Sequence, residues 1–290
     1  MTRLLTFFGL VLVTATATAS VTVVDDAGRN VTLPAPAHRI VSLAPNITDA
    51  LFAAGAGAYV VGTSRFSDYP AEAKNVPVVG DATMIDLERI VGLKPDVVVV
   101  WKSGNSAAQV DKLTRLGIPV FYSETARLDQ VASTTRRLGK LAGTEETAER
   151  NAAAFEAELR RLKTANAGKK RLKVFFQIWD RPLMTVGRAQ IIDDALTLCG
   201  GDNIFADLDQ AAPTVGREAV LARNPDAILS GGGEGESLND WKASAFLSAV
   251  KHDNVFAIDA PTLALPSPSI LSGVTTLCHG LDQARTRAAR

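Results

Sequence analysis

The chain contains the stretch Leu87-Glu88-Arg89-Ile90-Val91-Gly92-Leu93-Lys94-Pro95-Asp96, followed at once by four valines at residues 97–100. The pattern recurs in the second half of the chain as Arg217-Glu218-Ala219-Val220-Leu221-Ala222-Arg223-Asn224-Pro225-Asp226, before an apolar run at residues 227–229. In both copies a glutamate opens a short helix, and the proline ends it because proline disfavours helical backbone in the preceding residue. The apolar run is typical of a buried parallel strand. A helix-to-strand unit used once in each half predicts two α/β lobes of the same design.

Length and composition agree with two globular lobes. A chain of 290 residues exceeds the usual size of a single core, and its 47% hydrophobic and 21% charged residues are typical of a globular protein. Lys+Arg 31 balances Asp+Glu 31, so the net charge does not indicate a nucleic-acid partner. An enzyme or a small-molecule binder fits this composition better.

The first residues have the features of a secretory signal. Arg3 provides a basic start, residues 4–13 form an apolar run, and Ala17-Thr18-Ala19 is a small-x-small cleavage pattern. The run is too short to span a membrane comfortably, so we expect a cleaved signal peptide and a periplasmic protein. In that oxidising compartment Cys199 and Cys278 are expected to form a disulfide bond, with two buried free thiols as the alternative.

Strands alternate with helices along the rest of the chain, which predicts mostly parallel sheets flanked by helices. A turn cluster at residues 25–28 predicts an opening β-hairpin. Residues 144–167, with Thr144 as N-cap and one apolar face, predict a single helix of about 33 Å that joins the lobes. The predicted divisions are a signal peptide at 1–19, an N-terminal α/β lobe at 20–142, the connecting helix at 143–168 and a C-terminal α/β lobe at 169–290.

Aromatic and arginine side chains follow the carboxyl ends of several predicted strands, where ligands bind in open α/β sheets. Arg65 and Phe66 follow the second core strand, Trp101 follows the third, and Trp179 follows the first strand of the second lobe. Each aromatic side chain, taken alone, is explained by packing at the edge of its own lobe. Together they favour an aromatic-lined cleft between the lobes.

The sequence carries no recognisable catalytic set or metal-ligand spacing. It lacks the G-x-S-x-G and H-E-x-x-H patterns, and its three histidines are too scattered to suggest a site. Asp193 and Asp194 are expected to form an exposed helix start and not a metal pair. We therefore predict no catalytic residue, no metal site and no cofactor.

Several stretches carry a resemblance to a known family. They include Arg39-Ile40-Val41-Ser42-Leu43-Ala44-Pro45, Ser67-Asp68-Tyr69-Pro70, the two glutamate units, Trp101 with Gly104-Asn105, and Cys199-Gly200-Gly201-Asp202-Asn203-Ile204-Phe205. The chain resembles the periplasmic vitamin B12 (cobalamin)-binding proteins of bacterial ABC importers. More broadly, it resembles the helical-backbone class of substrate-binding proteins, which also serves siderophores and haem. The resemblance covers nearly all of the chain from about residue 39 onward.

The resemblance implies two lobes joined by one long helix, with the ligand between them. In such families a glutamate on each lobe forms a salt bridge with arginines of the membrane permease, and those positions match Glu88 and Glu218. An acid that stabilises a helix N-terminus explains either residue alone, but less readily their repetition in both lobes. Cys199 and Cys278 match the disulfide of the family.

The ligand-binding positions match the family only in part. Phe66 matches a cleft tyrosine and Trp101 a tryptophan, while other aromatic positions hold Ala82, Met184 and Ala212. The acidic and arginine contacts expected near residues 262–265 are replaced by Thr-Leu-Ala-Leu. These departures leave room for another corrinoid, a haem or an iron-siderophore. The ligand-binding residues expected in this chain are Phe66, Trp101, Trp179, Met184 and Arg65.

The sequence thus predicts a monomeric periplasmic protein that captures a corrinoid and delivers it to an ABC permease through Glu88 and Glu218, with modest closure on binding. A haem or ferric-siderophore receptor is the alternative, and it would need a Tyr or His iron ligand or an arginine cluster in the cleft. An exported α/β enzyme would require a catalytic set that the sequence does not show.

Overall fold

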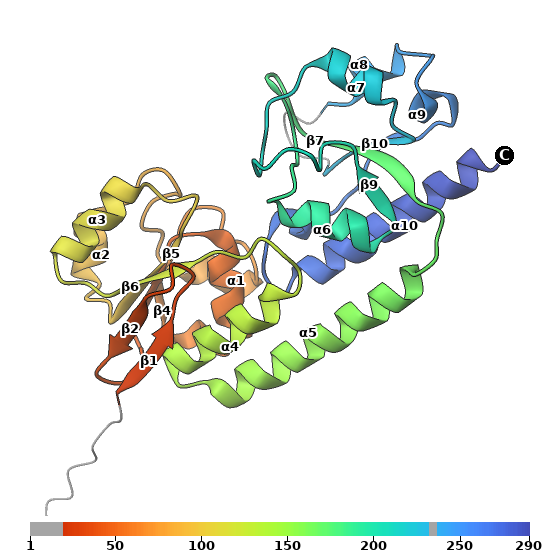
Figure 1. Cartoon of the computed structure of the whole chain (residues 1–290). Helices are drawn as coiled ribbons and strands as arrows, with labels where there is room; N and C mark the ends of the chain where they lie inside the picture. Colours follow the sequence, from red (N-terminus) through yellow and green to blue (C-terminus); the bar gives the residue numbers. More distant parts are fainter. Residues whose placement is uncertain (1–19, 232–236) are drawn as a thin grey trace, which may run out of the picture.

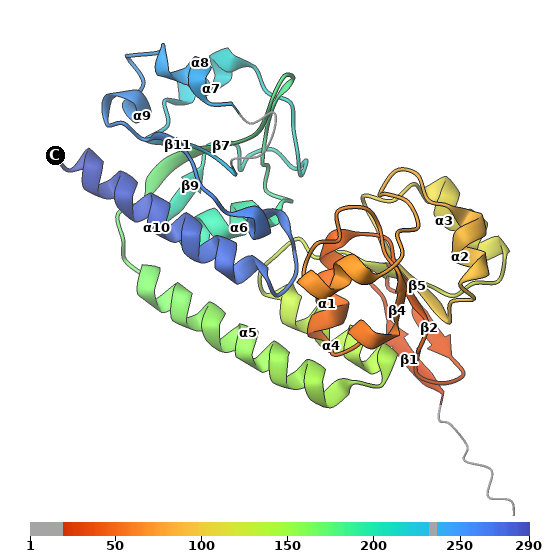
Figure 2. The same ribbon diagram turned by 180° about the vertical axis from the view of Figure 1, so that it is seen from behind.

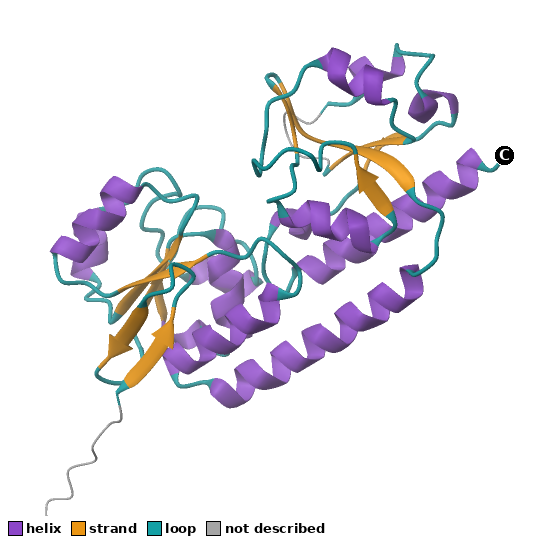
Figure 3. Cartoon of the chain, viewed as in Figure 1, coloured by secondary structure: helices purple, strands orange, loops and turns teal. Residues whose placement is uncertain are grey.

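The computed structural model describes residues 20–231 and 237–290, so the signal peptide expected at residues 1–19 lies outside the described residues. Two α/β lobes stand side by side and are joined by one long helix (Figure 1). The strands gather in two separate groups, one in each lobe, with helices around them (Figure 3). The predicted two-lobed α/β architecture is confirmed.

The first lobe is built on a parallel sheet of order β4-β3-β5-β6, with the predicted antiparallel hairpin β1-β2 beside it. Its strands are β1 (Val21–Val24), β2 (Asn30–Leu33), β3 (Ile40–Ser42), β4 (Val60–Gly62), β5 (Val97–Trp101) and β6 (Val120–Ser123). Its helices are α1 (Pro45–Ala53), α2 (Leu87–Gly92), α3 (Ala107–Arg115) and α4 (Gln130–Ala142), with short 3-10 turns η1 (Gly57–Tyr59) and η2 (Ala71–Asn75).

The second lobe repeats the strand order of the first. Parallel strands run in the order β11-β10-β7-β9, and β8 adds an antiparallel partner to the far end of β7. The strands are β7 (Leu172–Asp180), β8 (Leu183–Thr185), β9 (Gly201–Asn203), β10 (Ala227–Ser230) and β11 (Val255–Ala257). The helices are α6 (Ile191–Leu198), α7 (Arg217–Arg223), α8 (Asn239–Lys242), α9 (Ser248–Lys251) and α10 (Ile270–Ala288), with the 3-10 turn η3 (Pro261–Ala264).

The repeated Pro-Asp unit makes the same contacts in both lobes. The backbone N–H of Asp96 donates to the carbonyl of Arg39, and its carboxylate accepts from the N–H of Arg39, both at 2.8 Å. Asp226 makes the matching pair of bonds with Lys173, at 2.7 and 2.9 Å. Each aspartate therefore ties the start of one buried strand to the start of its neighbour, which explains why the unit recurs with its spacing unchanged.

The hydrophobic cores of both lobes extend into α4 and α5 (Glu145–Asn166). Leu141 and Ala148, where α4 meets α5, belong to the first core, whereas Val131 of α4 and Leu159 of α5 belong to the second. Seen from behind, α5 runs along both lobes with α10 beside its second half (Figure 2). We propose that α5 separates the two lobes, with residues 20–142 as the N-terminal lobe and residues 169–290 as the C-terminal lobe.

Charged side chains also join α4 to α5. Arg136 of α4 donates to both Glu149 and Glu156 of α5, with closest distances of 2.6 Å to each. Such partly exposed pairs add little stability, but a guanidinium held by two carboxylates fixes the relative position of the two helices.

Two local predictions need correction. Thr144 occupies the N-cap position of α5 as predicted, but its hydroxyl donates to the carbonyl of Ala54 at 2.7 Å and makes no capping hydrogen bond. The strand expected to end at residue 178 continues through Trp179 and Asp180, because β8 pairs with this end of β7. Trp179 therefore lies in a strand and not in the loop that follows it.

Cys199 and Cys278 form the predicted disulfide, which links the end of α6 to α10. Both are buried in the core of the second lobe, at 0% and 5% exposure. Within the described part of the chain, no helix is long and apolar enough to cross a membrane.

Candidate functional site

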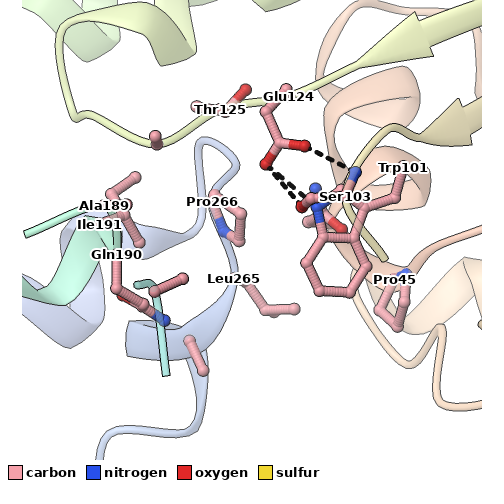
Figure 4. Close-up of a pocket in the computed structure, with 14 residues that line it drawn as sticks. Pro45, Trp101, Ser103, Glu124, Thr125, Ala189, Gln190, Ile191, Leu265 and Pro266 are labelled. Carbon is pink, nitrogen blue, oxygen red and sulfur yellow. Dashed lines mark hydrogen bonds between the residues drawn. The ribbon is translucent and has the colours of Figure 1, made fainter. Parts of the chain in front are cut away.

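A cavity of about 260 Å³ lies between the lobes, at the carboxyl ends of their strands. Segments that follow β3, β5 and β6 form one wall, and segments near α6 and before α10 form the other (Figure 4). The lining residues include Pro45, Asn46, Trp101, Ser103, Glu124 and Thr125 from the first lobe and Gln190, Ile191, Leu265 and Pro266 from the second. Both lobes therefore contribute to one site, as expected for a ligand held between them.

Trp101, the last residue of β5, is held by the turn that follows it. Its backbone N–H donates to the side-chain oxygen of Asn105 at 2.7 Å, and the amide of Asn105 donates to the carbonyl of Leu43 at 3.0 Å. Gly104 lies against the indole ring, and a Cβ at this position would stand 1.9 Å from a ring carbon. The Trp-Lys-Ser-Gly-Asn stretch thus fixes the indole on the cavity wall.

Glu124 also holds Trp101, and it is not among the ligand-binding residues predicted from the sequence. Its carboxylate accepts from the indole N–H of Trp101 at 3.2 Å and from the backbone N–H and hydroxyl of Ser103 at 2.9 and 3.1 Å (Figure 4). The backbone N–H of Glu124 donates to Asp26 at 2.7 Å. Because Glu124 directly follows β6, the strand-end rule that selected Trp101 would also have selected this residue.

The other predicted ligand-binding residues do not line this cavity. Phe66 is 74% exposed with a φ of 66°, a backbone conformation that is uncommon for a bulky residue, and its neighbour Arg65 is exposed. Trp179 is 43% exposed and donates to the carbonyl of Arg181 at 3.0 Å, with Met184 opposite it on β8. Phe66 and Trp179 lie near the carboxyl ends of β4 and β7, which is the side of each sheet that faces the cleft.

Two carboxylates connect the lobes beside the cavity. Asp49 of α1 is 4% exposed and accepts from the backbone N–H and hydroxyl of Ser269, the residue that precedes α10, at 3.2 and 2.9 Å. Asp194 of α6 accepts from the backbone N–H of Leu128, ahead of α4, at 2.8 Å. These bonds restrain the lobes where they meet.

The prediction that Asp193 and Asp194 form an exposed helix start is wrong, because α6 begins at the junction of the lobes. Both side chains are half-buried, and Asp193 accepts from Asn203 at 2.8 Å. Burial raises the pKa of Asp193 above its ordinary value, against the opposing effect of the Asn203 hydrogen bond. Among the residues that the structure describes, no group of three or more His, Cys, Asp and Glu is placed to hold a metal ion.

Glu88 and Glu218 occupy matching places in the two lobes. Each lies in the first turn of its helix, α2 or α7, just before the Pro-Asp strand. Both side chains are exposed, and neither forms an ion pair with another described residue. Both helices lie on the side of their lobes away from α5 (Figures 1 and 2).

The sequence model of a family described as "Periplasmic binding protein" matches residues 40–262, more than half of the chain. A vitamin B12-binding protein of Salmonella paratyphi A is 39% identical over 247 residues, which cover 85% of this chain and 91% of the relative. The crystal structure of the periplasmic vitamin B12 binding protein BtuF of Vibrio cholerae is 34% identical, with a TM-score of 0.79, over 86% of this chain and 98% of that one. The periplasmic heme-binding protein RhuT from Roseiflexus sp. RS-1 is 25% identical, with a TM-score of 0.74, over 85% of this chain and 98% of that one.

Proposed function

The chain belongs to the periplasmic binding protein family, and we propose that it captures a corrinoid between its lobes and delivers it to an ABC import permease. The observation that carries this proposal is the indole of Trp101, which is fixed on the wall of the cavity between the lobes. Two of the similar proteins named above are vitamin B12-binding proteins. Membership of the family implies a periplasmic location, which we propose is reached through cleavage of a signal peptide at residues 1–19.

The chemistry of the cleft suits a corrinoid. A corrin is a broad macrocycle with apolar faces and amide side chains, so it needs a flat apolar contact and a few hydrogen-bonding groups. Trp101 offers the flat face, and Asn46 and Gln190 offer amides on opposite walls. The ligand exceeds the cavity, so we propose that it also fills the open cleft and contacts Phe66, Trp179, Met184 and Arg65 there.

A haem or ferric siderophore remains the second candidate, because a heme-binding protein shares the fold at 25% identity. Haem requires an axial ligand, and its propionates favour basic partners. The described residues that line the cavity itself include no His, Tyr, Met, Lys or Arg, and Met184 and Arg65 lie outside it in the open cleft. The lack of an axial ligand and of a basic partner beside Trp101 favours the corrinoid. We propose no enzymatic activity for this chain, since its named relatives are binding proteins.

Delivery would use the paired glutamates. Glu88 and Glu218 present one negative charge on each lobe, which lets a single permease contact both lobes of one protein molecule. The permease would release the ligand by moving the lobes apart against the restraint of α5 and of the Asp49 and Asp194 contacts. A monomer suffices for this cycle.

Titration with cyanocobalamin, dicyanocobinamide, haem and ferric siderophores tests the ligand class, followed by tryptophan quenching and visible absorption. We expect saturation by the corrinoids alone. Trp101→Ala is expected to weaken corrinoid binding about 30-fold, the effect of removing an aromatic anchor worth about 2 kcal/mol. Phe246→Ala, which removes an exposed aromatic outside the cavity, is the matched control. Absence of any response to corrinoids would end the proposal.

The interlobe contacts predict limited closure. Small-angle scattering should show little compaction when the ligand binds, because a continuous helix and the two hydrogen-bonded contacts of Asp49 and Asp194 restrain the lobes. Asp49→Ala is expected to lower the free energy of unfolding by about 1–2 kcal/mol, since it removes a buried acceptor at the start of α10, and to increase the compaction. Asp111→Ala, at an exposed site on α3, should change neither quantity. Large compaction of the unaltered protein would contradict this prediction.

A further inference from the structure

We propose that Glu124 sets the selectivity of the cleft, so that it accepts corrinoids with amide side chains and rejects ligands that present carboxylates. The inference rests on the proposed function, because it concerns which corrinoids that same cavity admits. It assigns to Glu124 two effects: orientation of the Trp101 indole and exclusion of negatively charged ligands.

Glu124 orients the indole from its edge. One carboxylate oxygen accepts from the indole N–H at 3.2 Å and from the Ser103 hydroxyl at 3.1 Å, while the other accepts from the Ser103 backbone N–H at 2.9 Å. Gly104 lies against the ring, because a Cβ at this position would stand 1.9 Å from a ring carbon. Trp101 also lines the cavity, so its ring can contact a macrocycle there.

The carboxylate of Glu124 can accept one further hydrogen bond, from a donor group of the ligand. Two carboxylate oxygens offer about four lone-pair positions, and the described contacts use three of them. The oxygen that binds the Ser103 backbone carries the unused position. A primary amide at the edge of a corrin donates N–H groups, so it can satisfy this position directly. A carboxylate at the same place has no proton to donate.

Charge strengthens the discrimination. Among the described residues that line the cavity, Glu124 is the one with an ionisable side chain, whereas Arg65 lies outside the cavity in the open cleft. The nearby Asp26 is paired with Arg137 at 2.8 Å, and Arg127 is shared between Asp129 and Asp194. A ligand carboxylate would therefore meet a like charge between walls of proline, leucine and isoleucine, where the effective dielectric is low and repulsion is strong.

A matched pair of corrinoids tests the proposal: dicyanocobinamide, which carries amides, and dicyanocobyrinic acid, which carries carboxylates at the same positions. We expect the unaltered protein to bind the amide form at least about 100-fold more tightly, since each tenfold step corresponds to about 1.4 kcal/mol. Glu124→Gln should raise affinity for the acid at least about tenfold, because it removes the like charge. It should lower affinity for the amide form, because a glutamine oxygen that accepts from the indole leaves the NH₂ group, a donor, at the position that accepts from the ligand amide.

Near-UV circular dichroism separates the two effects of Glu124. Glu124→Gln is expected to keep the tryptophan signal, whereas Glu124→Ala should alter it and weaken binding of the amide form. Glu146→Gln, at an exposed site on α5, is the matched control and should leave the signal and both affinities unchanged. An amide-to-acid preference that is absent, or that persists in Glu124→Gln, overturns the proposal. Failure of the unaltered protein to bind either corrinoid would instead overturn the proposed function, and this inference with it.

Discussion

Replacement of both Glu88 and Glu218 by arginine is expected to abolish ligand uptake while leaving ligand capture unchanged. Both side chains are exposed at the first turns of matching helices. Reversing them would replace the two attractive contacts that we propose with cationic groups of the permease by two repulsive ones. Coupling energies of about 1.5–7 kcal/mol have been measured for close charge pairs across an interface. The double reversal should therefore weaken docking by at least about 100-fold, and each single reversal by less.

Two measurements check this prediction together. Uptake of labelled cyanocobalamin is followed in cells whose own binding protein has been deleted, and capture by the purified variant is followed by calorimetry. The matched control reverses Glu145 and Glu146, two acids in the first turn of α5 on the opposite side of the protein. Each reversal at a helix start costs about 0.3–1 kcal/mol of stability, so thermal unfolding is compared in both variants. Normal uptake by the Glu88 and Glu218 double variant would exclude these residues as docking contacts.

Loss of the Cys199–Cys278 disulfide is expected to produce the largest change in stability. The bond closes a loop with a sequence separation of 79 residues, for which the chain-entropy model gives about 4.5 kcal/mol of stabilisation. It also lies inside the second core, where it joins α6 to α10. The Cys199→Ala/Cys278→Ala double variant should unfold at a markedly lower denaturant concentration than the oxidised protein.

Denaturant unfolding with and without reductant measures this effect. The reduced unaltered protein should resemble the double variant, and reductant should not change the variant itself. Because both sulfurs are buried, reduction of the native protein should be slow and should accelerate as denaturant opens the second lobe. Equal unfolding midpoints for the oxidised protein and the variant would show that the second core does not depend on the bond.

The elements that could be predicted from the sequence depend on neighbouring residues. The β1-β2 hairpin follows from its turn cluster, α5 from its apolar face, and the starts of β5 and β10 from the Pro-Asp pairs. The end of β7 could not be predicted in this way, because Trp179 and Asp180 are in a strand only through their pairing with β8. Thr144 makes no capping hydrogen bond for a similar reason, since its hydroxyl donates to the carbonyl of Ala54, the residue after α1.

The residues of the candidate site also fall into two groups, those that could be predicted from the sequence and those that could not. Trp101 is recognisable from its place at a strand end, and the glutamate pair from its repetition, so the sequence by itself determines the two-lobed design and the residues that we propose contact the permease. It does not show that Glu124 meets Trp101, or that Asp49 reaches Ser269 from the other lobe. Those contacts exist only after both sheets have formed and α5 has placed the lobes against each other. Backbone preference and hydrophobic period act over a few residues, whereas the shape and charge of the cleft depend on which distant loops the folded helices bring together.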